Sequence, residues 1–371
     1  MTRPTVAIYL PDLSGGGAER LHVQLAPRLA ALGYAPRLLL DRRAGILLDA
    51  VPPTVAVDVL DAKRQLSALP KLVRYLRRTR PALLLANTEH MNVMAVVAAK
   101  LAGGETRVIV TQHNSFSDQV RRPTWQFRLL PPLYRWALPR ADAIVAVSQG
   151  VADDLAARCG LPGSAMSVIH NGVVTDDFDR RAAADVAHPW FVEGRPVIMG
   201  MGRFVPQKDF PTLVRAFAAM ADRTDARLML LGEGPQRAEL QALAAELGVA
   251  DRVALPGFMS DPLPWLRRAR LFVLSSRFEG FGNVLCEALA CGVPVVSTDC
   301  PYGPSEILAD GAFGRLVPVG DVERLSAAML ASLSVPPKAE RLAERGKSFS
   351  VNACAEHYVA LFDQVRARKR G

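Results

Sequence analysis

The chain has 371 residues, of which 50% are hydrophobic and 22% are charged. This composition excludes a disordered protein, a coiled coil and a collagen-like fibre, and the length predicts two domains that each bury a core. The net charge is +9, and residues 1–190 hold 23 Lys and Arg against 16 Asp and Glu. That excess predicts an acidic partner, such as a nucleic acid, an anionic lipid or a phosphorylated substrate.

The sequence shows no membrane-spanning run and no secretory signal at its start. Its five cysteines are odd in number and contain no C-x-x-C pair, so we expect neither a disulfide framework nor a zinc site. These features predict a reduced, cytoplasmic environment, with the cysteines acting as small buried apolar residues.

Short apolar runs alternate with amphipathic stretches through the first half of the chain. The runs predict strands at residues 5–10, 37–41, 55–60, 82–87, 107–112, 143–148 and 167–170. The stretches between them predict helices at residues 17–32, 64–79, 91–101, 124–138 and 150–159. Continuous Val, Ile and Leu runs are typical of buried parallel strands, so the pattern predicts a doubly wound sheet.

A polar, broken stretch over residues 173–195 separates this half from a second one with the same plan. Strands are predicted at residues 196–201, 227–231, 252–255, 271–275, 294–298 and 315–318. Helices are predicted at residues 210–221, 235–247, 262–268, 283–290, 322–330 and 352–368. We therefore predict an α/β protein with two Rossmann-like domains, over residues 1–180 and 181–351, followed by a closing helix in residues 352–371. Ligands of such sheets bind beyond the carboxyl ends of the strands, so the strand-end loops of both halves are the candidate sites.

Two such loops lie in the first half. Three glycines, including Gly16 and Gly17, follow the first strand and open a helix, which exposes backbone N–H groups able to hold an anion. A flexible turn is the simpler alternative. His113 ends another strand, where its imidazole can bond a sugar hydroxyl or a reacting oxygen.

The loop after the first strand of the second half carries Gly202, Arg203 and, five residues later, Lys208. Two cations beside a glycine-exposed backbone suit a diphosphate, and they would stabilise charge that grows on a departing phosphate.

A second loop, SSRFEGFGNVLCEA, places Glu279 in a glycine-rich turn and Glu287 one turn into the helix that starts near Asn283. The two carboxylates can accept hydrogen bonds from sugar and ribose hydroxyls. A general acid and base pair, as in a glycoside hydrolase, and simple helix capping are the alternatives.

The segments GGGAER, TQHNS, AIVAVSQGV, VIHNGV, GMGRFVPQKDFPTLVRAF, LLGEGP, LPGF and SSRFEGFGNVLCEALACGVPVVSTD together resemble glycosyltransferase family 4, the group 1 retaining transferases. The likeness runs from residue 5 to about residue 320, and its most specific parts are the two glutamates and the Arg203 and Lys208 pair. It implies a GT-B fold, in which two Rossmann-like domains face each other across a cleft, and a closing helix that packs back on the first domain.

The resemblance also implies site roles. Arg203 and Lys208 would clamp the donor diphosphate, Glu279 would bind the donor sugar, and Glu287 would hold the ribose. His113 would contact the donor sugar and help to position the acceptor. Further donor-binding positions implied by the family are Gly16, Gly17, Gly202, Phe258, Gly280, Phe281, Gly282, Asn283 and Val284. No metal or other cofactor is implied.

The implied activity is transfer of a sugar, with retention, from a nucleotide-sugar of the UDP-sugar class to a glycan or lipid-linked acceptor. The segment CPYGPSEIL is similar to its counterpart in many bacterial surface-polysaccharide transferases. A non-hydrolysing nucleotide-sugar epimerase, and a non-catalytic protein that binds sugar-nucleotides or nucleic acid, are the alternatives. No nucleic-acid-binding signature is present, so we expect no nucleic-acid partner.

Two stretches combine basic and aromatic residues: KLVRYLRRTR at residues 71–80 and RRPTWQFR at residues 121–128, which leads to Tyr134 and Trp136. Docking on the anionic inner face of a plasma membrane and a solvated charged face with core aromatics are both compatible with this pattern.

Overall fold

The protein divides into two compact units in a computed structural model that describes residues 3–62, 65–117 and 125–368. The first unit consists of residues 1–172 and 350–371, and the second of residues 173–349. The predicted boundary at residue 180 instead falls inside helix α7 (Phe178–Ala182), which belongs to the second unit.

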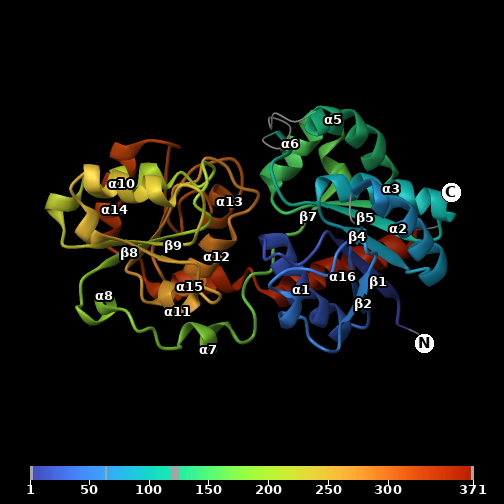
Figure 1. The fold of residues 1–371 in the computed structure, drawn as a ribbon, viewed down its shortest axis with the longest axis horizontal. Coiled ribbons are helices and arrows are strands. Elements are labelled where there is room, and N and C mark those ends of the chain that lie inside the picture. Colours follow the sequence, from blue (N-terminus) through green and yellow to red (C-terminus); the bar gives the residue numbers. More distant parts are fainter. Residues whose placement is uncertain (1–2, 63–64, 118–124, 369–371) are drawn as a thin grey trace. The chain divides into compact units, whose positions relative to one another are not determined.

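The first unit is built on a parallel seven-stranded sheet with the order β3-β2-β1-β4-β5-β6-β7 (Figure 1). Its strands are β1 (Thr5–Leu10), β2 (Ala35–Leu40), β3 (Ala56–Val59), β4 (Leu83–Ala86), β5 (Arg107–Gln112), β6 (Ala143–Ala146) and β7 (Met166–Val168). Its helices are α1 (Gly17–Ala31), α2 (Gln65–Thr79), α3 (Glu89–Ala102), α5 (Trp125–Ala137), α6 (Gln149–Cys159) and α16 (Val351–Ala367).

Alternate side chains of these strands enter two separate cores, as the pleat of a sheet requires. Ala7 and Tyr9 of β1 pack with α2, α3 and α5, whereas Val6 and Ile8 pack with α1 and α16. Tyr358 and Phe362 of α16 are almost completely buried in the second of these cores. The closing helix is therefore an integral part of the first unit.

The second unit repeats the plan with a parallel six-stranded sheet of order β10-β9-β8-β11-β12-β13. Its strands are β8 (Val197–Met201), β9 (Arg227–Leu231), β10 (Val253–Gly257), β11 (Leu271–Leu274), β12 (Val295–Thr298) and β13 (Arg315–Val317). Besides α7, its helices are α8 (Pro189–Val192), α9 (Phe210–Ala218), α10 (Arg237–Glu246), α11 (Leu263–Arg267), α12 (Asn283–Ala290), α13 (Pro304–Leu308), α14 (Val322–Ser334) and α15 (Ala339–Lys347). Helices α9, α10 and α14 share one core with the strands.

Short 3-10 turns at Leu48–Ala50, Leu138–Arg140, Gly163–Ala165, Ala221–Arg223 and Ala250–Arg252 complete the described elements. Four helices of the second unit were not predicted: α7, α8, α13 and α15. Helix α15 is highly charged and buries few side chains, but Gly346 lets it approach α12 so closely that a Cβ there would lie 2.1 Å from the Ala290 nitrogen. A close contact made through a glycine cannot be recognised from the pattern of apolar residues in the sequence.

The strand order of each sheet reverses direction beside its first strand, between β1 and β4 and between β8 and β11. Chains leave such neighbouring strands toward opposite faces of a sheet, so a crevice opens beyond their carboxyl ends. The loops after β1, β4, β8 and β11 are therefore where this fold presents ligand-binding groups.

Candidate functional site

An ion pair joins the loops that follow β8 and β11 at the crevice of the second sheet. Lys208 Nζ lies 2.5 Å from Glu279 Oε1, and the two side chains are only 18% and 8% exposed. Ser276 Oγ donates to the same carboxylate oxygen at 2.6 Å. The structure thus brings together two of the predicted site residues, which lie 71 positions apart in the sequence.

Further hydrogen bonds hold the two loops in register. Ser275 Oγ donates to the Lys208 carbonyl at 2.8 Å, and the Arg277 N–H donates to the Gln207 carbonyl at 2.8 Å. Arg277 Nε also pairs with the buried carboxylate of Asp209 at 3.1 Å. Because these bonds fix the backbone on both sides of Lys208, its ammonium group is placed by the fold and not by a flexible stem alone.

Two glycines allow neighbouring chain segments to pack closely around the loop after β8. Gly202 begins the loop after β8 and lies beside the Lys208 stem, where an added Cβ would lie 3.2 Å from Lys208 Cε. Gly232 faces Gly202 so closely that a Cβ there would lie 1.9 Å from the Gly202 carbonyl oxygen. A side chain at position 232 would therefore displace the backbone of the loop that carries Lys208.

The glycine-rich turn is fixed from its other side by the loop after β12. The Glu279 N–H donates to the Pro301 carbonyl at 2.7 Å, and the Tyr302 N–H donates to the Glu279 carbonyl at 3.0 Å. The main chain of Glu279 is therefore held between two strand-end loops, which leaves its carboxylate directed by Lys208 and Ser276.

Helix α12 begins directly after this turn. Gly282 has a φ of +105° at the helix N-cap, a conformation that favours glycine. Phe281 is buried, with its ring 5.5 Å from that of Phe349, so its side chain packs inside the second unit. Gly280 is likewise buried, Asn283 and Val284 are partly buried in the first turn, and Glu287 is partly buried one turn further on.

The other predicted donor residues of this unit are exposed. Arg203 lies on the surface of the β8 loop, and no ion pair of its side chain occurs among the residues that the structure describes. Phe258, in the loop after β10, is 57% exposed. Both are available to a ligand, as a diphosphate clamp and a base-stacking side chain need to be.

In the first unit, Gly16 and Gly17 are exposed at the start of α1. A Cβ at Gly16 would lie 2.3 Å from Glu19 Oε2. The Glu19 carboxylate therefore folds back over the glycine turn, and the N–H groups that the sequence predicted to be exposed have an acidic neighbour. An anionic ligand has to displace this carboxylate to reach them.

His113 follows β5 and contacts a second histidine that the sequence analysis missed. The ring of His22, on α1, lies 5.7 Å from that of His113 in an edge-to-face arrangement. His22 is fully buried, and its Nδ1 donates to the Ala18 carbonyl at 2.7 Å. Burial lowers the pKa of His22 to about 4. Burial and the neighbouring His22 lower the pKa of His113 to about 3, so both rings are neutral at physiological pH.

A buried polar network supports the β5 end beneath His113. Asn92 Nδ2 donates to the Thr111 carbonyl at 3.0 Å and to Tyr134 Oη at 3.1 Å, and Tyr134 Oη donates to Gln112 Oε1 at 3.1 Å. Gln112 Nε2 lies 3.3 Å from Glu89 Oε1, at the start of α3. Glu89 was not predicted as a site residue, although its place directly after β4 was a signal that could have found it.

The cysteine thiols are buried and have raised pKa values. All five cysteines are buried and free, and burial raises the pKa of the Cys159 thiol to about 11 and that of Cys300 to about 12. Across residues 3–62, 65–117 and 125–368, no group of three or more His, Cys, Asp or Glu side chains is arranged to hold a metal ion. In the same part of the chain, no helix is both long enough and apolar enough to cross a membrane.

Two family models match the chain, one in each half. Residues 15–177 match a model described as Glycosyltransferase Family 4, and residues 186–349 match one described as Glycosyl transferases group 1.

Among curated proteins, an N-acetylgalactosamine-N,N'-diacetylbacillosaminyl-diphospho-undecaprenol 4-alpha-N-acetylgalactosaminyltransferase from Campylobacter jejuni is 28% identical over 324 residues, which is 85% of this chain and 86% of that protein. The lipopolysaccharide core biosynthesis glycosyltransferase LpsE of Rhizobium meliloti is 40% identical over 171 residues, which is 45% of this chain and 49% of that protein.

Among solved structures, Anabaena HepE in complex with UDP matches with a TM-score of 0.78 at 21% identity, and the match covers 97% of this chain and 100% of that one. The same protein in complex with UDP-glucose matches with a TM-score of 0.79. These likenesses identify the architecture of the two sheets as the GT-B fold.

Proposed function

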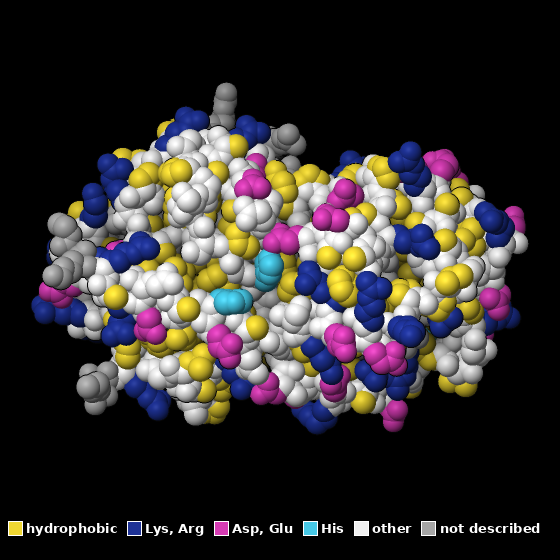
Figure 2. Space-filling view, turned by 180° about the vertical axis from the view of Figure 1, so that it is seen from behind, with side chains coloured by type: hydrophobic (Ala, Val, Ile, Leu, Met, Phe, Trp, Pro, Cys, Tyr) yellow, Lys and Arg dark blue, Asp and Glu magenta, His cyan; other side chains and the backbone are white. Residues whose placement is uncertain are grey.

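Because the chain belongs to the family 4, group 1 glycosyltransferases, which use nucleotide-sugar donors, we propose that it transfers a sugar from a UDP-sugar to a lipid-linked glycan, with retention and without a metal ion. The observation that carries this proposal is the Lys208 and Glu279 pair at the crevice of the second sheet, with Arg203 exposed on the same loop as Lys208. Family membership sets aside the epimerase and the non-catalytic alternatives. On the face shown in Figure 2, Lys and Arg side chains are interspersed with Asp and Glu, which does not favour a nucleic-acid partner.

The proposed chemistry follows from where the charges lie. Arg203 and Lys208 bind the donor diphosphate and stabilise the negative charge that grows on it as the glycosidic bond breaks. Glu279, held by Lys208 and Ser276, accepts hydrogen bonds from the donor sugar's hydroxyls. The leaving phosphate takes the proton of the acceptor hydroxyl. We assign no protein nucleophile.

His113 contributes hydrogen bonding and not acid catalysis. Its lowered pKa keeps the ring neutral, so it can orient a sugar hydroxyl without adding a positive charge. The Nε2 atoms of His113 and His22 are buried and have no hydrogen-bond partner among the described residues. A hydroxyl of the donor sugar or of the acceptor would supply a hydrogen-bond partner for the Nε2 atom of His113.

The UDP-sugar class and the lipid-linked acceptor rest on similar proteins. HepE has been solved with UDP and with UDP-glucose, and the Campylobacter enzyme is named for a diphospho-undecaprenol substrate. A panel of nucleotide-sugars, tested for thermal stabilisation of the protein, checks the donor without a known acceptor. UDP-sugars should raise the melting temperature most. Stabilisation by GDP-sugars alone would contradict the UDP assignment, and stabilisation by none would contradict donor binding.

We further propose that the first unit docks on an anionic membrane surface. Leu129, Leu133 and Trp136 lie along one face of α5 and are 51%, 44% and 39% exposed. The Trp136 ring has Arg140 at 4.8 Å and Lys100 Nζ at 5.7 Å from its centre. Exposed apolar side chains with adjacent cations suit the lipid interface. The stretch at residues 121–124 lies outside the described residues.

Vesicle flotation tests this docking. The double variant Leu129→Ser with Leu133→Ser should lose binding to vesicles that contain anionic lipid, whereas Val335→Ser, at a 75% exposed apolar residue of the second unit, should not. Equal binding by the double variant and the wild type would refute the docking face.

A further inference from the structure

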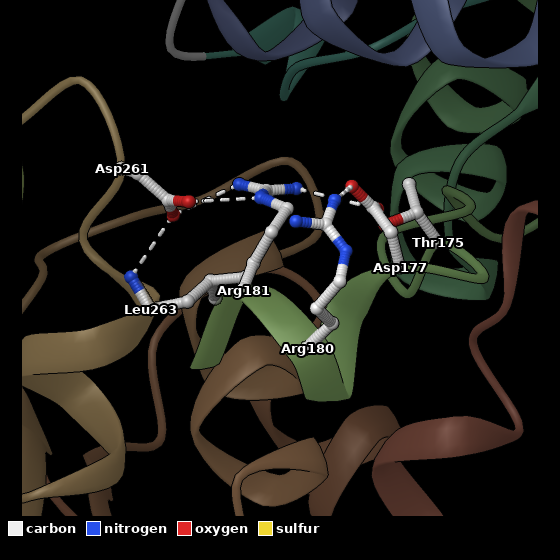
Figure 3. A network of polar contacts seen from close by, with 6 residues as sticks. All are labelled: Thr175, Asp177, Arg180, Arg181, Asp261 and Leu263. Carbon is white, nitrogen blue, oxygen red and sulfur yellow. Dashed lines mark hydrogen bonds and ion pairs between the residues drawn. The ribbon is translucent and has the colours of Figure 1, made fainter. Parts of the chain in front are cut away.

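A side-chain pair connects helix α7 to the loop that carries Phe258. This loop, residues 258–262, follows β10 and is called the base loop here, because Phe258 is proposed to contact the base. Its Asp261 carboxylate accepts hydrogen bonds from Arg181 Nε and Nη2 at 2.8 and 2.9 Å, one to each oxygen (Figure 3). The Leu263 N–H also donates to Asp261, at 3.3 Å, where α11 begins. Arg181 thereby connects the base loop to α7, 80 positions earlier in the chain.

Side-chain contacts hold helix α7 in place, so the backbone position of Arg181 is fixed. Asp177 lies 3.9 Å from Arg181 Nη1 and accepts hydrogen bonds from Thr175 and Arg180 (Figure 3). Lys347 of α15 pairs with Asp179 at 2.8 Å. The Arg181 side chain is 23% exposed, whereas that of its neighbour Arg180 is 77% exposed and pairs with Asp177.

Arg181 also acts on the proposed ribose-binding residue. Its pKa is raised first by the hydrogen bonds to Asp261, against the effect of burial, and then by the negative charges of Asp261, Asp177 and Glu287. Glu287 is thus close enough for its charge to matter to Arg181. The Arg181 guanidinium thereby adds positive charge near the carboxylate that is proposed to accept hydrogen bonds from the ribose hydroxyls.

We propose that Arg181 and Asp261 are positioning residues for the nucleoside half of the donor, with the pair fixing the base loop and the Arg181 charge supporting Glu287. This inference rests on the proposed donor site, because it assumes that Phe258 meets the base and Glu287 the ribose. An arginine suits the task better than a lysine, since its planar fork binds both oxygens of Asp261 and so fixes direction as well as distance.

Calorimetric titration with UDP and with 2′-deoxy-UDP tests the proposal on the full chain. Arg181→Gln and Asp261→Asn should weaken UDP binding by about tenfold, the low end of what a charge-assisted hydrogen bond contributes. Arg181→Gln should also lower the preference for UDP over its deoxy analogue, because Glu287 loses its supporting charge. Arg181→Lys should keep that preference while still weakening UDP binding. Arg180→Gln is the matched control and should bind both ligands as the wild type does.

If Arg181 had a purely structural role, its variants would change the melting temperature without changing the preference for UDP over 2′-deoxy-UDP. Melting curves without ligand therefore accompany each titration, and Arg181→Lys remains informative if Arg181→Gln folds poorly. Equal UDP affinity in Arg181→Gln and Arg180→Gln would overturn the proposal, as would an unchanged preference for UDP over 2′-deoxy-UDP in a folded Arg181→Gln variant. Failure of the wild type to bind any of UDP, GDP and ADP would instead refute the donor site itself.

Discussion

Replacing Lys208 by methionine separates the stability of the second unit from its proposed chemistry. The variant removes the cation 2.5 Å from the Glu279 carboxylate and leaves Ser276 as its side-chain partner among the described residues. Breaking a fully buried ion pair costs about 3–5 kcal/mol, and an exposed pair contributes about 0.2–1 kcal/mol. With side chains 18% and 8% exposed, this pair lies nearer the buried limit, so we expect a loss of about 2–3 kcal/mol.

For a unit of this size each kcal/mol lowers the melting temperature by about 2–4 °C, so the unit should melt about 4–12 °C lower. Turnover should fall by about 100-fold or more, because a stabiliser of the leaving diphosphate is lost. Adding Glu279→Gln to Lys208→Met removes the uncompensated charge and should restore most of the stability but none of the activity.

Scanning calorimetry and a donor-turnover assay on the same preparations measure both effects. Arg324→Met is the matched control, since Arg324 Nε pairs with Asp321 at 3.5 Å with side chains 70% and 28% exposed. It should change neither turnover nor, by more than about 1 kcal/mol, stability. Wild-type turnover in Lys208→Met, or recovery of turnover in the double variant, would show that Lys208 only neutralises Glu279.

Three further outcomes are expected. Arg203→Ala should lower turnover at least tenfold with an unchanged melting curve, and wild-type turnover would remove Arg203 from the diphosphate clamp. Activity should survive a chelator such as EDTA, and a loss that manganese restores would contradict the metal-free mechanism. In the folded protein, His22 and His113 have pKa values of about 4 and about 3, whereas both titrate near 6.5 in the unfolded chain. Below pH 6.5 the unfolded chain therefore binds more protons than the folded one. The first unit should lose about 1.4 kcal/mol of stability per pH unit for each histidine as the pH falls. Melting curves from pH 7.5 to 4.5 measure this, and those of His22→Leu should depend less on pH.

The strands were predictable from the sequence because parallel strands covered on both faces are nearly continuous apolar runs, such as Leu83 to Leu85. Helices α13 and α15, which were not predicted, do not depend on a long apolar face. Helix α13 is a single turn that starts at Pro304, and α15 relies on the close approach of Gly346 to α12. Helix α13 is too short to show a helical period, whereas α15 is polar overall and has few buried residues, Leu342 and Gly346, which lie on one face.

The structure brings two of the predicted site residues, Lys208 and Glu279, into a direct contact that the sequence did not predict. Lys208 and Glu279 were assigned to different parts of a donor, and their direct ion pair depends on the alignment of two loops. His22 occupies a position that reads as ordinary helix core, and only the packing of α1 beside the β5 end makes it a neighbour of His113. The assigned roles of the individual site residues stay predictions until variants are measured.

The placement of α16 in the core of the first unit has a consequence for biosynthesis. Residues 173–349 form one uninterrupted stretch, whereas the first sheet needs Tyr358 and Phe362 from a segment translated after that stretch. The second unit can therefore complete its fold without α16, whereas the first exposes an apolar face until α16 has been made and has docked, and chaperones should engage the chain there. Limited proteolysis of a released chain that ends at residue 349 should cut the first unit and spare the second.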